Sequence, residues 1–449
     1  MNKNFCGLGI PEILLPGPGI DLAKWPVVAC DQYTSQPEYW EKVSALVGDS
    51  PSTLRLIYPE VYLGKEDGSK RIKDIHLRMR EYLEENILVS QGAGFVLVDR
   101  RTSRVPSRKG LIVALDLECY DYHPGSQTLI RATEGTVLER IPPRVKIREE
   151  AAVESPHILV LIDDPERTVI EPVARQASRL KKLYSVDLMM NGGHIEGYQI
   201  ADAQIIAGIF KSLQALAAAE EFNQKYGLSD QAPLLYAVGD GNHSLATAKA
   251  VWEKIKQSNP GIDPDRHPAR YALVEMVNIH DPGIKFEPIH RVLFGATPEQ
   301  LFPAMQEYYR KRGADFRCRP SAVKYLALNL QEKRKENQAS HRIGYITGKG
   351  GGVIEIGNPA HHLEVGTLQA FLDDYTSKNS AARIDYIHGE DVVIELGSMP
   401  GNIGFYLPAM EKSDLFKTVI VDGVLPRKTF SMGEAEEKRF YMECRRIIL

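Results

Sequence analysis

A short segment near the middle of the chain carries the residue types best suited to phosphate chemistry. It runs from an apolar stretch at residues 234–238, through the sequence GDGNHS at 239–244, into apolar residues at helical spacing. Gly239 and Gly241 permit a tight backbone path and the close approach of a ligand. A helix that starts there presents unpaired N–H groups and its positive dipole end, so an anion gains several hydrogen bonds.

The polar side chains of this segment could act on a bound phosphate. His243 can supply a proton or a hydrogen bond near neutral pH, and Asp240 is suited to hold a metal or a substrate hydroxyl. The backbone from Gly241 through Asn242 to Ser244 would cradle the phosphate itself. The alternative interpretation is a glycine-rich turn whose aspartate only caps the helix.

Buried strands and amphipathic helices must position this segment. Short apolar runs predict strands at residues 94–98, 111–117, 157–162, 234–238 and 272–279. Apolar residues at helical spacing predict a helix over 70–88, and Asp202 is expected to cap a helix that stops at Gly227. Because strands and helices are interspersed, we expect a mixed-sheet core of the α/β to α+β class.

The length of 449 residues is enough for at least two hydrophobic cores. The pattern changes after Phe294, so we expect an α/β domain at 1–295 and a smaller C-terminal α+β domain at 296–449. Strands are predicted at 325–330, 342–346 and 353–356. The glycine-rich run 348–352 lacks the Gly-x-x-x-x-Gly-Lys-Ser/Thr spacing of a phosphate loop and is interpreted as a hairpin turn.

Bulk composition narrows the class of protein. The formal net charge is −4, from 55 basic and 59 acidic side chains, which argues against a dedicated nucleic-acid-binding protein. No apolar run approaches the roughly 18 residues of a membrane span, so we expect no membrane partner and a cytoplasmic location. The five cysteines form no Cys-x-x-Cys pair, and no metal ligands can be assigned.

Charged residues elsewhere are secondary candidates for the same site. Glu134 precedes Arg140 and Arg144, which lie on a segment that Pro142 and Pro143 should keep from being a regular helix throughout. Loops that carry arginine often present it to ligands, although surface arginines are still more often paired with carboxylates.

Three further positions follow apolar stretches or lie in proline-containing turns. Arg291 comes shortly after Pro288, Lys428 follows a Pro-Arg pair, and Asp31 directly follows the apolar residues 27–29. Each could enter a binding site, and each has an ordinary structural explanation in a strand end or a turn.

The order of several motifs resembles one known family over nearly the whole chain. VVACDQY, TEGT, ERIPPR, GDGNHSLATA, FEPIHRVLF and GVLPRKTF follow one another as in the bacterial and archaeal family called domain of unknown function 1015. The Asp-Gly-His-His-Arg turn of that family is in turn similar to the turn of the partition-protein and sulfiredoxin-like superfamily. Members of that superfamily include kinases of free serine, and their turn binds nucleotide phosphates. The resemblance therefore implies a nucleotide, ATP or ADP with Mg²⁺, and a small-molecule substrate.

This chain departs from the family turn at two positions. Asp240, Gly241 and His243 match, but Asn242 replaces the first histidine and Ser244 replaces the arginine. Another cation must then neutralise the phosphate. The candidates are Arg140, Arg144, Arg148, Arg291 and Lys428.

The leading hypothesis is a phosphoryl-transfer enzyme acting on a small hydroxylated metabolite, as a serine kinase or a phosphoserine-dephosphorylating enzyme. Such catalysis needs positioning, charge neutralisation and a carboxylate, here Asp240 or Glu134, that orients the nucleophile. The alternative is a regulatory module that binds a nucleotide without turnover. DNA binding is a third and weaker hypothesis, because the charge balance is acidic.

Overall fold

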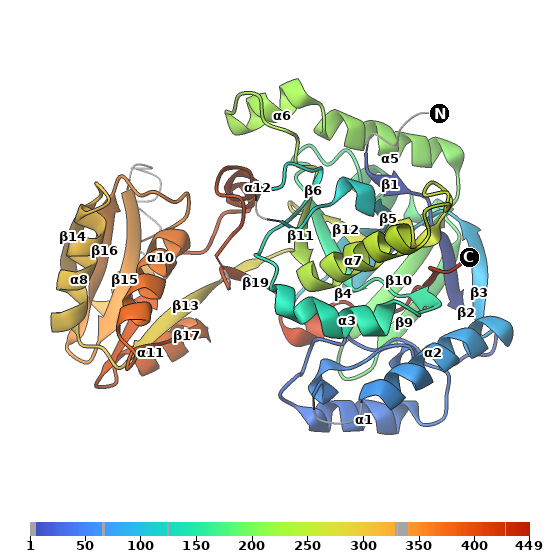
Figure 1. Cartoon of the computed structure of the whole chain (residues 1–449), viewed down its shortest axis with the longest axis horizontal. Coiled ribbons are helices and arrows are strands. Elements are labelled where there is room, and N and C mark those ends of the chain that lie inside the picture. The colour runs from blue at the N-terminus through green and yellow to red at the C-terminus, as the bar shows by residue number, and fades with distance from the viewer. Residues whose placement is uncertain (1–5, 65–67, 124, 328–329, 331–339, 427) are drawn as a thin grey trace. The chain divides into compact units, whose positions relative to one another are not determined.

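The computed structural model describes residues 6–64, 68–123, 125–327, 330, 340–426 and 428–449, and it divides into two compact units (Figure 1). The first unit comprises Met1–Ile284 and Gly433–Leu449, and the second comprises Lys285–Met432. Each unit has its own large β-sheet, so the mixed α/β fold class expected from the sequence is confirmed.

The two units divide after Ile284 and after Met432, whereas the sequence suggests a boundary at residue 295. Strand β13 (Phe286–Phe294) pairs with strands of the second unit, and the C-terminal strand β20 (Arg445–Arg446) pairs with β7 (Val153–Glu154) of the first. The final segment returns because it is apolar: Phe440, Tyr441 and Met442 are buried. The division into an α/β domain at 1–295 and an α+β domain at 296–449 stays a prediction.

A nine-stranded mixed sheet forms the centre of the first unit, in the order β6-β11-β8-β12-β5-β4-β10-β9, with β1 beside β5. Strand β11 runs parallel to β6, and β12 runs parallel to β8, while the other pairs are antiparallel. The strands are β1 (Leu8–Gly9), β4 (Phe95–Arg101), β5 (Arg108–Asp116), β6 (Ile130–Ala132), β8 (Ile158–Ile162), β9 (Lys182–Leu188), β10 (Gly193–Ile200), β11 (Tyr236–Asp240) and β12 (Tyr271–Asn278). A small separate sheet pairs β2 (Glu12–Pro16) with β3 (Leu88–Ala93).

Both faces of this sheet are covered, which explains the continuous apolar runs in its strands. In β4, Val96 and Val98 pack into one hydrophobic cluster, and Phe95 and Leu97 pack into another. Helices α1 (Pro37–Val47) and α2 (Gly68–Glu84) contribute to the first cluster, whereas α5 (Ala203–Leu216) and α7 (Asn242–Ser258) contribute to the second. Shorter helices are α3 (Ile141–Arg148), α4 (Glu171–Ala174) and α6 (Ala219–Tyr226).

Most of the predicted elements of this unit are confirmed. The five predicted strands coincide with β4, β5, β8, β11 and β12, and the helix at 70–88 coincides with α2. The single helix expected from Asp202 to Gly227 is wrong, because Ala218 is extended (φ −65°, ψ 123°) and separates α5 from α6. Both end signals are nevertheless used: Asp202 caps α5, and Gly227 ends α6 in the left-handed conformation.

The second unit is built on an antiparallel sheet in the order β14-β16-β15-β18-β13-β17, with β19 also paired with β13. Its further strands are β14 (Asp315–Ser321), β15 (Ser340–Thr347), β16 (Gly350–Gly357), β17 (Arg383–His388), β18 (Asn402–Tyr406) and β19 (Phe430–Met432). Its helices are α8 (Pro298–Arg310), α10 (Glu364–Lys378), α11 (Glu390–Gly397) and α12 (Lys412–Val421).

Two sequence predictions for this unit have opposite outcomes. The hairpin turn within 348–352 is confirmed, because Thr347 pairs with Gly350 where β15 turns into β16. The strand at 325–330 is wrong: Val323–Tyr325 is one turn of 3-10 helix, and residues 326–327 continue as helix, with 328–329 outside the described residues. Leu326 is buried in the core against Val292 and Ile346, and a helical turn serves that burial as well as a strand would. Among the described residues, no helix is long and apolar enough to cross a membrane.

Candidate functional site

The turn at 239–244 joins β11 to α7, in the strand–turn–helix arrangement that the sequence predicts. Gly241 is the N-cap residue of α7 and is left-handed, with φ 80° and ψ 27°. A Cβ atom on Gly241 would lie 3.0 Å from the backbone Cα of Ile158 and 3.2 Å from Cδ2 of His157. A glycine is therefore required at position 241, and the turn lies directly against the start of β8.

The first turn of α7 has the properties of an anion site. Helix α7 is 17 residues long, and no side chain caps its first N–H groups. Asn242, which is only 9% exposed, donates from Nδ2 to the carbonyl of Val238 at 3.4 Å. Its Oδ1 atom is buried and has no hydrogen-bond partner among the described residues. A buried acceptor without a donor is uncommon and favours a hydrogen-bond donor, such as a ligand hydroxyl, at this position; it does not itself add to the binding of an anion.

Asp240 is held from two sides. Its Oδ1 accepts the N–H of Gly241 at 2.9 Å, and its Oδ2 lies 3.1 Å from Nζ of Lys438. Lys438 belongs to the C-terminal segment of the same unit and is mostly buried. The chain thus places a cation beside the turn at which Ser244 replaces the arginine of the family pattern.

His243 is a hydrogen-bond donor at this turn rather than a cation. Its Nε2 accepts the backbone N–H of Val137 at 3.2 Å, so the imidazole proton resides on Nδ1. Burial and the charges of Arg140 and Arg144 lower the pKa of His243, and the carboxylate of Asp31 opposes them only in part. The imidazole is therefore neutral at pH 7, with Nδ1–H left to bind a ligand.

The segment from Thr133 to Val137 lies beside the turn. The hydroxyl of Thr133 donates to the carbonyl of Val238 at 2.6 Å, and Val137 contacts His243. Glu134 lies on this segment and is partly buried. The buried hydroxyl of Thr136 has no partner among the described residues and is a second unsatisfied polar atom near the turn.

Arg140 and Arg144 are placed differently from the expectation of a rigid loop. Arg140 ends a short 3-10 helix (Leu138–Arg140), and Arg144 lies within α3, with Pro142 and Pro143 in the first turn of that helix. Prolines are tolerated there because the first N–H groups of a helix have no intrahelical acceptor. The guanidinium of Arg144 donates to Glu60 and, at 2.8 Å, to the carbonyl of Arg140. The positive charge of Arg144 is therefore already paired with the carboxylate of Glu60.

A second group of residues, which we call the Asp31–His157–Tyr441 group, lies against Gly241. His157 Nε2 is 3.5 Å from Oδ2 of Asp31, and His157 Nδ1 is 2.5 Å from the hydroxyl of Tyr441. That hydroxyl also accepts the N–H of Cys30 at 3.0 Å. Three segments far apart in the sequence are joined in this way.

The charges of this group are set by its own contacts. Burial alone would lower the pKa of His157, but Tyr441 and Asp31 raise it well above the usual value. Burial would raise the pKa of Asp31, but His157, Gln32 and Lys438 lower it. An aspartate carboxylate and an imidazolium therefore lie next to the turn between β11 and α7 at neutral pH.

A small cavity of about 160 Å³ opens between this group and the start of α7. Its polar lining includes Ser244, Thr247, His157 and Tyr441, and its apolar lining includes Leu63, Met79 and Ile147. Cys30 also lines it, which places Asp31 next to the cavity wall. This volume is smaller than an ordinary drug-sized pocket of about 300–1,000 Å³ and suits a small metabolite.

Arg291 and Lys428 belong to the second unit. Arg291 is fully buried in β13, donates from Nε to Gln369 at 3.1 Å and lies 4.8 Å above the ring of Tyr386. The guanidinium of Arg291 is therefore bound by side chains of its own unit. Lys428 is exposed and has a left-handed backbone with φ 58°.

Sequence reasoning identified the turn but missed most of its neighbours. Asp31 was a candidate because it follows an apolar run, whereas His157 looked like the first residue of a strand. Lys438 and Tyr441 carry no local signal, because only the return of the C-terminal segment brings them to the turn. In the part of the chain that the structure describes, no group of three or more His, Cys, Asp or Glu side chains could hold a metal ion.

Comparison with known families decides the family of the chain. The sequence model of one family matches residues 14–375. The chain belongs to this family, which is described as a protein of unknown function (DUF1015). The family resemblance seen in the sequence motifs is thereby confirmed. No curated protein matches the sequence.

Solved structures similar to this DUF1015 protein have low identity to it. A free serine kinase variant in complex with ADP covers 75% of this chain and 92% of its own, with 11% identity and a TM-score of 0.37. A conserved hypothetical protein from Pyrococcus furiosus covers 75% of this chain and 95% of its own, with 11% identity and a TM-score of 0.33. SbnI with a C-terminal truncation, from Staphylococcus aureus, covers 72% of this chain and 82% of its own, with 10% identity and a TM-score of 0.31.

Proposed function

We propose that this protein is a phosphoryl-transfer enzyme that uses ATP or ADP and acts on a small hydroxylated metabolite, with a hydroxy amino acid such as serine as the first candidate. The observation that carries the proposal is the start of α7. There a left-handed glycine and an uncapped helix terminus leave backbone N–H groups for an anion, and Nδ1–H of His243 is a further donor. Two cations lie nearby, Lys438 and the imidazolium of His157, and each is paired with a carboxylate, Asp240 and Asp31 respectively.

The phosphate groups of the donor would bind at the first turn of α7. The N–H groups of residues 242–244 and the helix dipole would hold the phosphate oxygens, and Nδ1–H of His243 would add a hydrogen bond. Lys438 would offset negative charge in place of the arginine that Ser244 replaces. Asp240 would act on Lys438, because its contact of 3.1 Å fixes the position of the ammonium group.

The acceptor would occupy the small cavity beside the turn. Asp31 would orient its hydroxyl: the preceding residue, Cys30, lines the cavity, and the lowered pKa of Asp31 keeps the side chain ionised. The carboxylates of Glu60 and Glu154 line the cavity but are paired with arginines. The hydroxyl oxygen forms a bond to the terminal phosphorus, and the bond from that phosphorus to the bridging oxygen breaks. The nucleotide leaves with that bridging oxygen, and the hydroxyl proton passes to Asp31. In the reverse direction the phosphate ester transfers its phosphoryl group to the nucleotide, and the ester is dephosphorylated.

The residues present fit a magnesium ion held mainly by phosphates. Mg²⁺ usually takes one or two carboxylates together with substrate phosphates and water. Asp240, at the end of β11 directly before the turn glycine, would be such a carboxylate, and Mg²⁺ would compete there with the ammonium group of Lys438. Bound Mg²⁺ would supply neutralisation of the phosphate charge.

The test is a direct assay of turnover. Purified protein is incubated with ATP or with ADP, Mg²⁺ and L-serine or another hydroxylated metabolite, and phosphorylated products are identified by mass spectrometry and phosphorus NMR. We expect a phosphorylated product with wild type and at least a hundred-fold lower rate with Asp31→Asn. Asp121→Asn, at an exposed aspartate that pairs with His123, serves as the matched control and should retain full activity.

The same experiment separates the proposal from the regulatory alternative. Saturable binding of ATP or ADP without a product from any acceptor, in either direction, would support a nucleotide-binding module that does not turn over. Absence of nucleotide binding would contradict both and would leave the turn a structural feature.

A further inference from the structure

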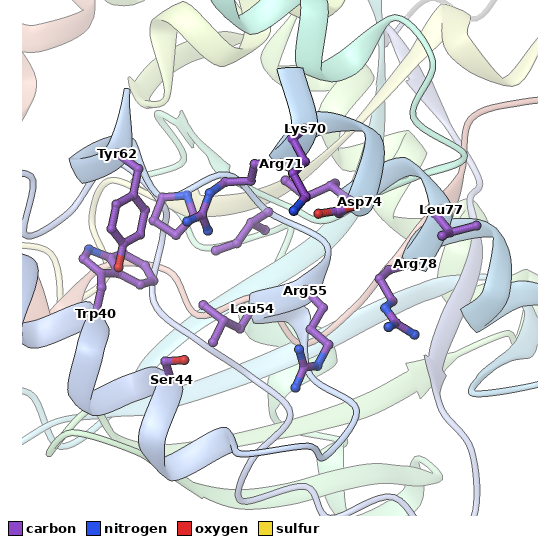
Figure 2. Close-up of a pocket in the computed structure, with 13 residues that line it drawn as sticks. Trp40, Ser44, Leu54, Arg55, Tyr62, Lys70, Arg71, Asp74, Leu77 and Arg78 are labelled. Carbon is purple, nitrogen blue, oxygen red and sulfur yellow. The ribbon is translucent and has the colours of Figure 1, made fainter. Parts of the chain in front are cut away.

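A second pocket of the first unit lies between α1 and α2 and has a volume of about 770 Å³ (Figure 2). Its basic lining residues are Arg55, Lys70, Arg71 and Arg78, and Asp74 is the acidic residue that lines it. The chain as a whole carries a formal net charge of −4, so this concentration of cations is local. It is a separate cavity from the one beside the turn and shares with it the lining residue Ile57.

The cations of this pocket differ in how far protein groups already neutralise them. Arg55 donates to the carbonyl of Gly48 at 2.5 Å and has no carboxylate partner among the described residues. Lys70 is exposed and likewise has no carboxylate within salt-bridge distance in the described parts of the chain. Arg78 pairs with Glu81 at 2.6 Å, but both side chains keep solvent contact. Among the described residues, Arg55 and Lys70 thus line the pocket without a carboxylate partner.

The rest of the pocket is apolar and aromatic. Leu54, Ile57, Pro59 and Ile75 line it together with Trp40 and Tyr62. The guanidinium of Arg71 lies 4.3 Å above the ring of Tyr62 and so is already fixed in the pocket wall. Figure 2 shows Trp40 and Tyr62 at the left of the view, Arg55 near its middle and Arg78 toward its right. A ligand that satisfies both sides carries an anionic group at one end and a ring or apolar group at the other.

We propose that this pocket binds an anionic metabolite of mononucleotide size, with its phosphate at Arg55, Lys70 and Arg78 and its ring system toward Tyr62 and Trp40. The volume falls within the usual range of about 300–1,000 Å³ for small-molecule sites. Arginine suits the phosphate end, because its planar group offers two parallel donors to an oxyanion. The inference does not depend on the reaction proposed for the turn.

The position of the pocket gives it a structural connection to the turn. Pro59 and Ile57 line the pocket, and the next residue along, Glu60, is the partner of Arg144 and lines the small cavity. A ligand in the pocket therefore contacts the same chain segment that faces the proposed acceptor site.

The test is calorimetric titration with adenosine monophosphate and, separately, with inorganic phosphate at fixed salt. We expect wild type to bind adenosine monophosphate at least ten-fold more tightly than phosphate. The double variant Arg55→Gln/Arg78→Gln should weaken adenosine monophosphate binding about ten- to a hundred-fold. The matched control Lys73→Gln/Arg80→Gln removes two basic residues of α2 that do not line the pocket and should change affinity less than two-fold.

Four results would overturn the inference. They are no saturable binding by wild type, equal affinity for phosphate and adenosine monophosphate, equal weakening in the control, and binding that is lost in Lys438→Met but kept in Arg55→Gln/Arg78→Gln. The last result would assign the ligand to the turn and leave the proposed function standing. Thermal unfolding of each variant, with a midpoint within a few degrees of wild type, shows that a loss of binding is not a loss of fold.

Discussion

Lys438 pairs with Asp240 at 3.1 Å, although 198 residues of sequence separate them. The contact places a cation from the C-terminal segment against the turn between β11 and α7. Ser244 stands where the family pattern has arginine, and Lys438, although paired with Asp240, is a cation beside the turn. The pairing also links the integrity of the proposed site to the docking of the last residues of the chain.

The first prediction concerns that lysine. Lys438→Met should weaken binding of ATP or ADP about ten- to a hundred-fold, because a charge-assisted contact to phosphate contributes about 1.5–3 kcal/mol. Ser244→Arg in the same variant should restore part of the affinity by returning a cation to the turn. Isothermal titration at fixed salt measures both effects.

Lys254→Met is the matched control for Lys438. Lys254 pairs with Glu149 on the surface, so its loss should leave affinity unchanged and stability within about 1 kcal/mol. Equal affinities of wild type and Lys438→Met would remove the lysine from the site.

The second prediction concerns the glycine of the turn. Gly241→Ala should lower the free energy of unfolding by more than about 1–2 kcal/mol, the usual cost of a left-handed residue, because the new Cβ would also lie 3.0 Å from the Ile158 backbone. Nucleotide binding should fall together with stability.

Gly208→Ala is the contrasting change. Gly208 lies in α5 with open space around it, and the substitution should stabilise the protein by about 0.5–1 kcal/mol. Urea unfolding compares the two, and a neutral Gly241→Ala would contradict the close packing described here.

The Asp31–His157 pair predicts how stability depends on pH. The pKa of His157 is raised in the folded protein, so its contribution is complete below the unfolded value and is lost as pH rises through the folded value. The pKa of Asp31 is lowered, so its contribution is present above the unfolded value and is lost as pH falls through the folded value. Both contributions are therefore present around neutral pH.

His157→Gln should remove the alkaline part of this dependence. As pH rises above about 6.5, the difference in unfolding free energy between wild type and His157→Gln should shrink as wild-type His157 loses its proton. His123→Gln, at an exposed surface pair with Asp121, should give a difference that is small at every pH. A constant difference for His157→Gln would show that its imidazole does not titrate in this range.

Sequence patterns were sufficient for the strands and for the turn because both depend on local order. The apolar runs of β4, β5, β8, β11 and β12 are signals within a few residues, as are the glycines around Asp240. The cation at the turn was not predictable in the same way. Arg144 was a reasonable candidate by its proline neighbours, but its guanidinium already contacts Glu60, which lies 84 residues earlier in the sequence. Contacts between distant segments carry no pattern that a single sequence displays.

The last prediction tests whether the C-terminal segment holds the site together. Arg439 is the residue after Lys438; it is 5% exposed, lies 3.0 Å from Oε2 of Glu275, and also pairs with Glu443. Glu275 is fully buried, and Arg108 is its other close partner at 3.3 Å. Arg439→Met should therefore cost about 3–5 kcal/mol, because it leaves the buried carboxylate of Glu443 without its cation and removes one of the two arginines paired with Glu275. Since Lys438 and Tyr441 lie on the same segment, nucleotide binding should fall in parallel with stability.

Arg104→Met is the control for Arg439→Met. It removes a surface pair with Glu434 and should cost less than about 1 kcal/mol, with binding unchanged. Denaturant unfolding and titration of both variants decide the matter: an Arg439→Met protein as stable as wild type, or one that is destabilised yet binds nucleotide normally at low temperature, would show that the site does not depend on this anchored segment.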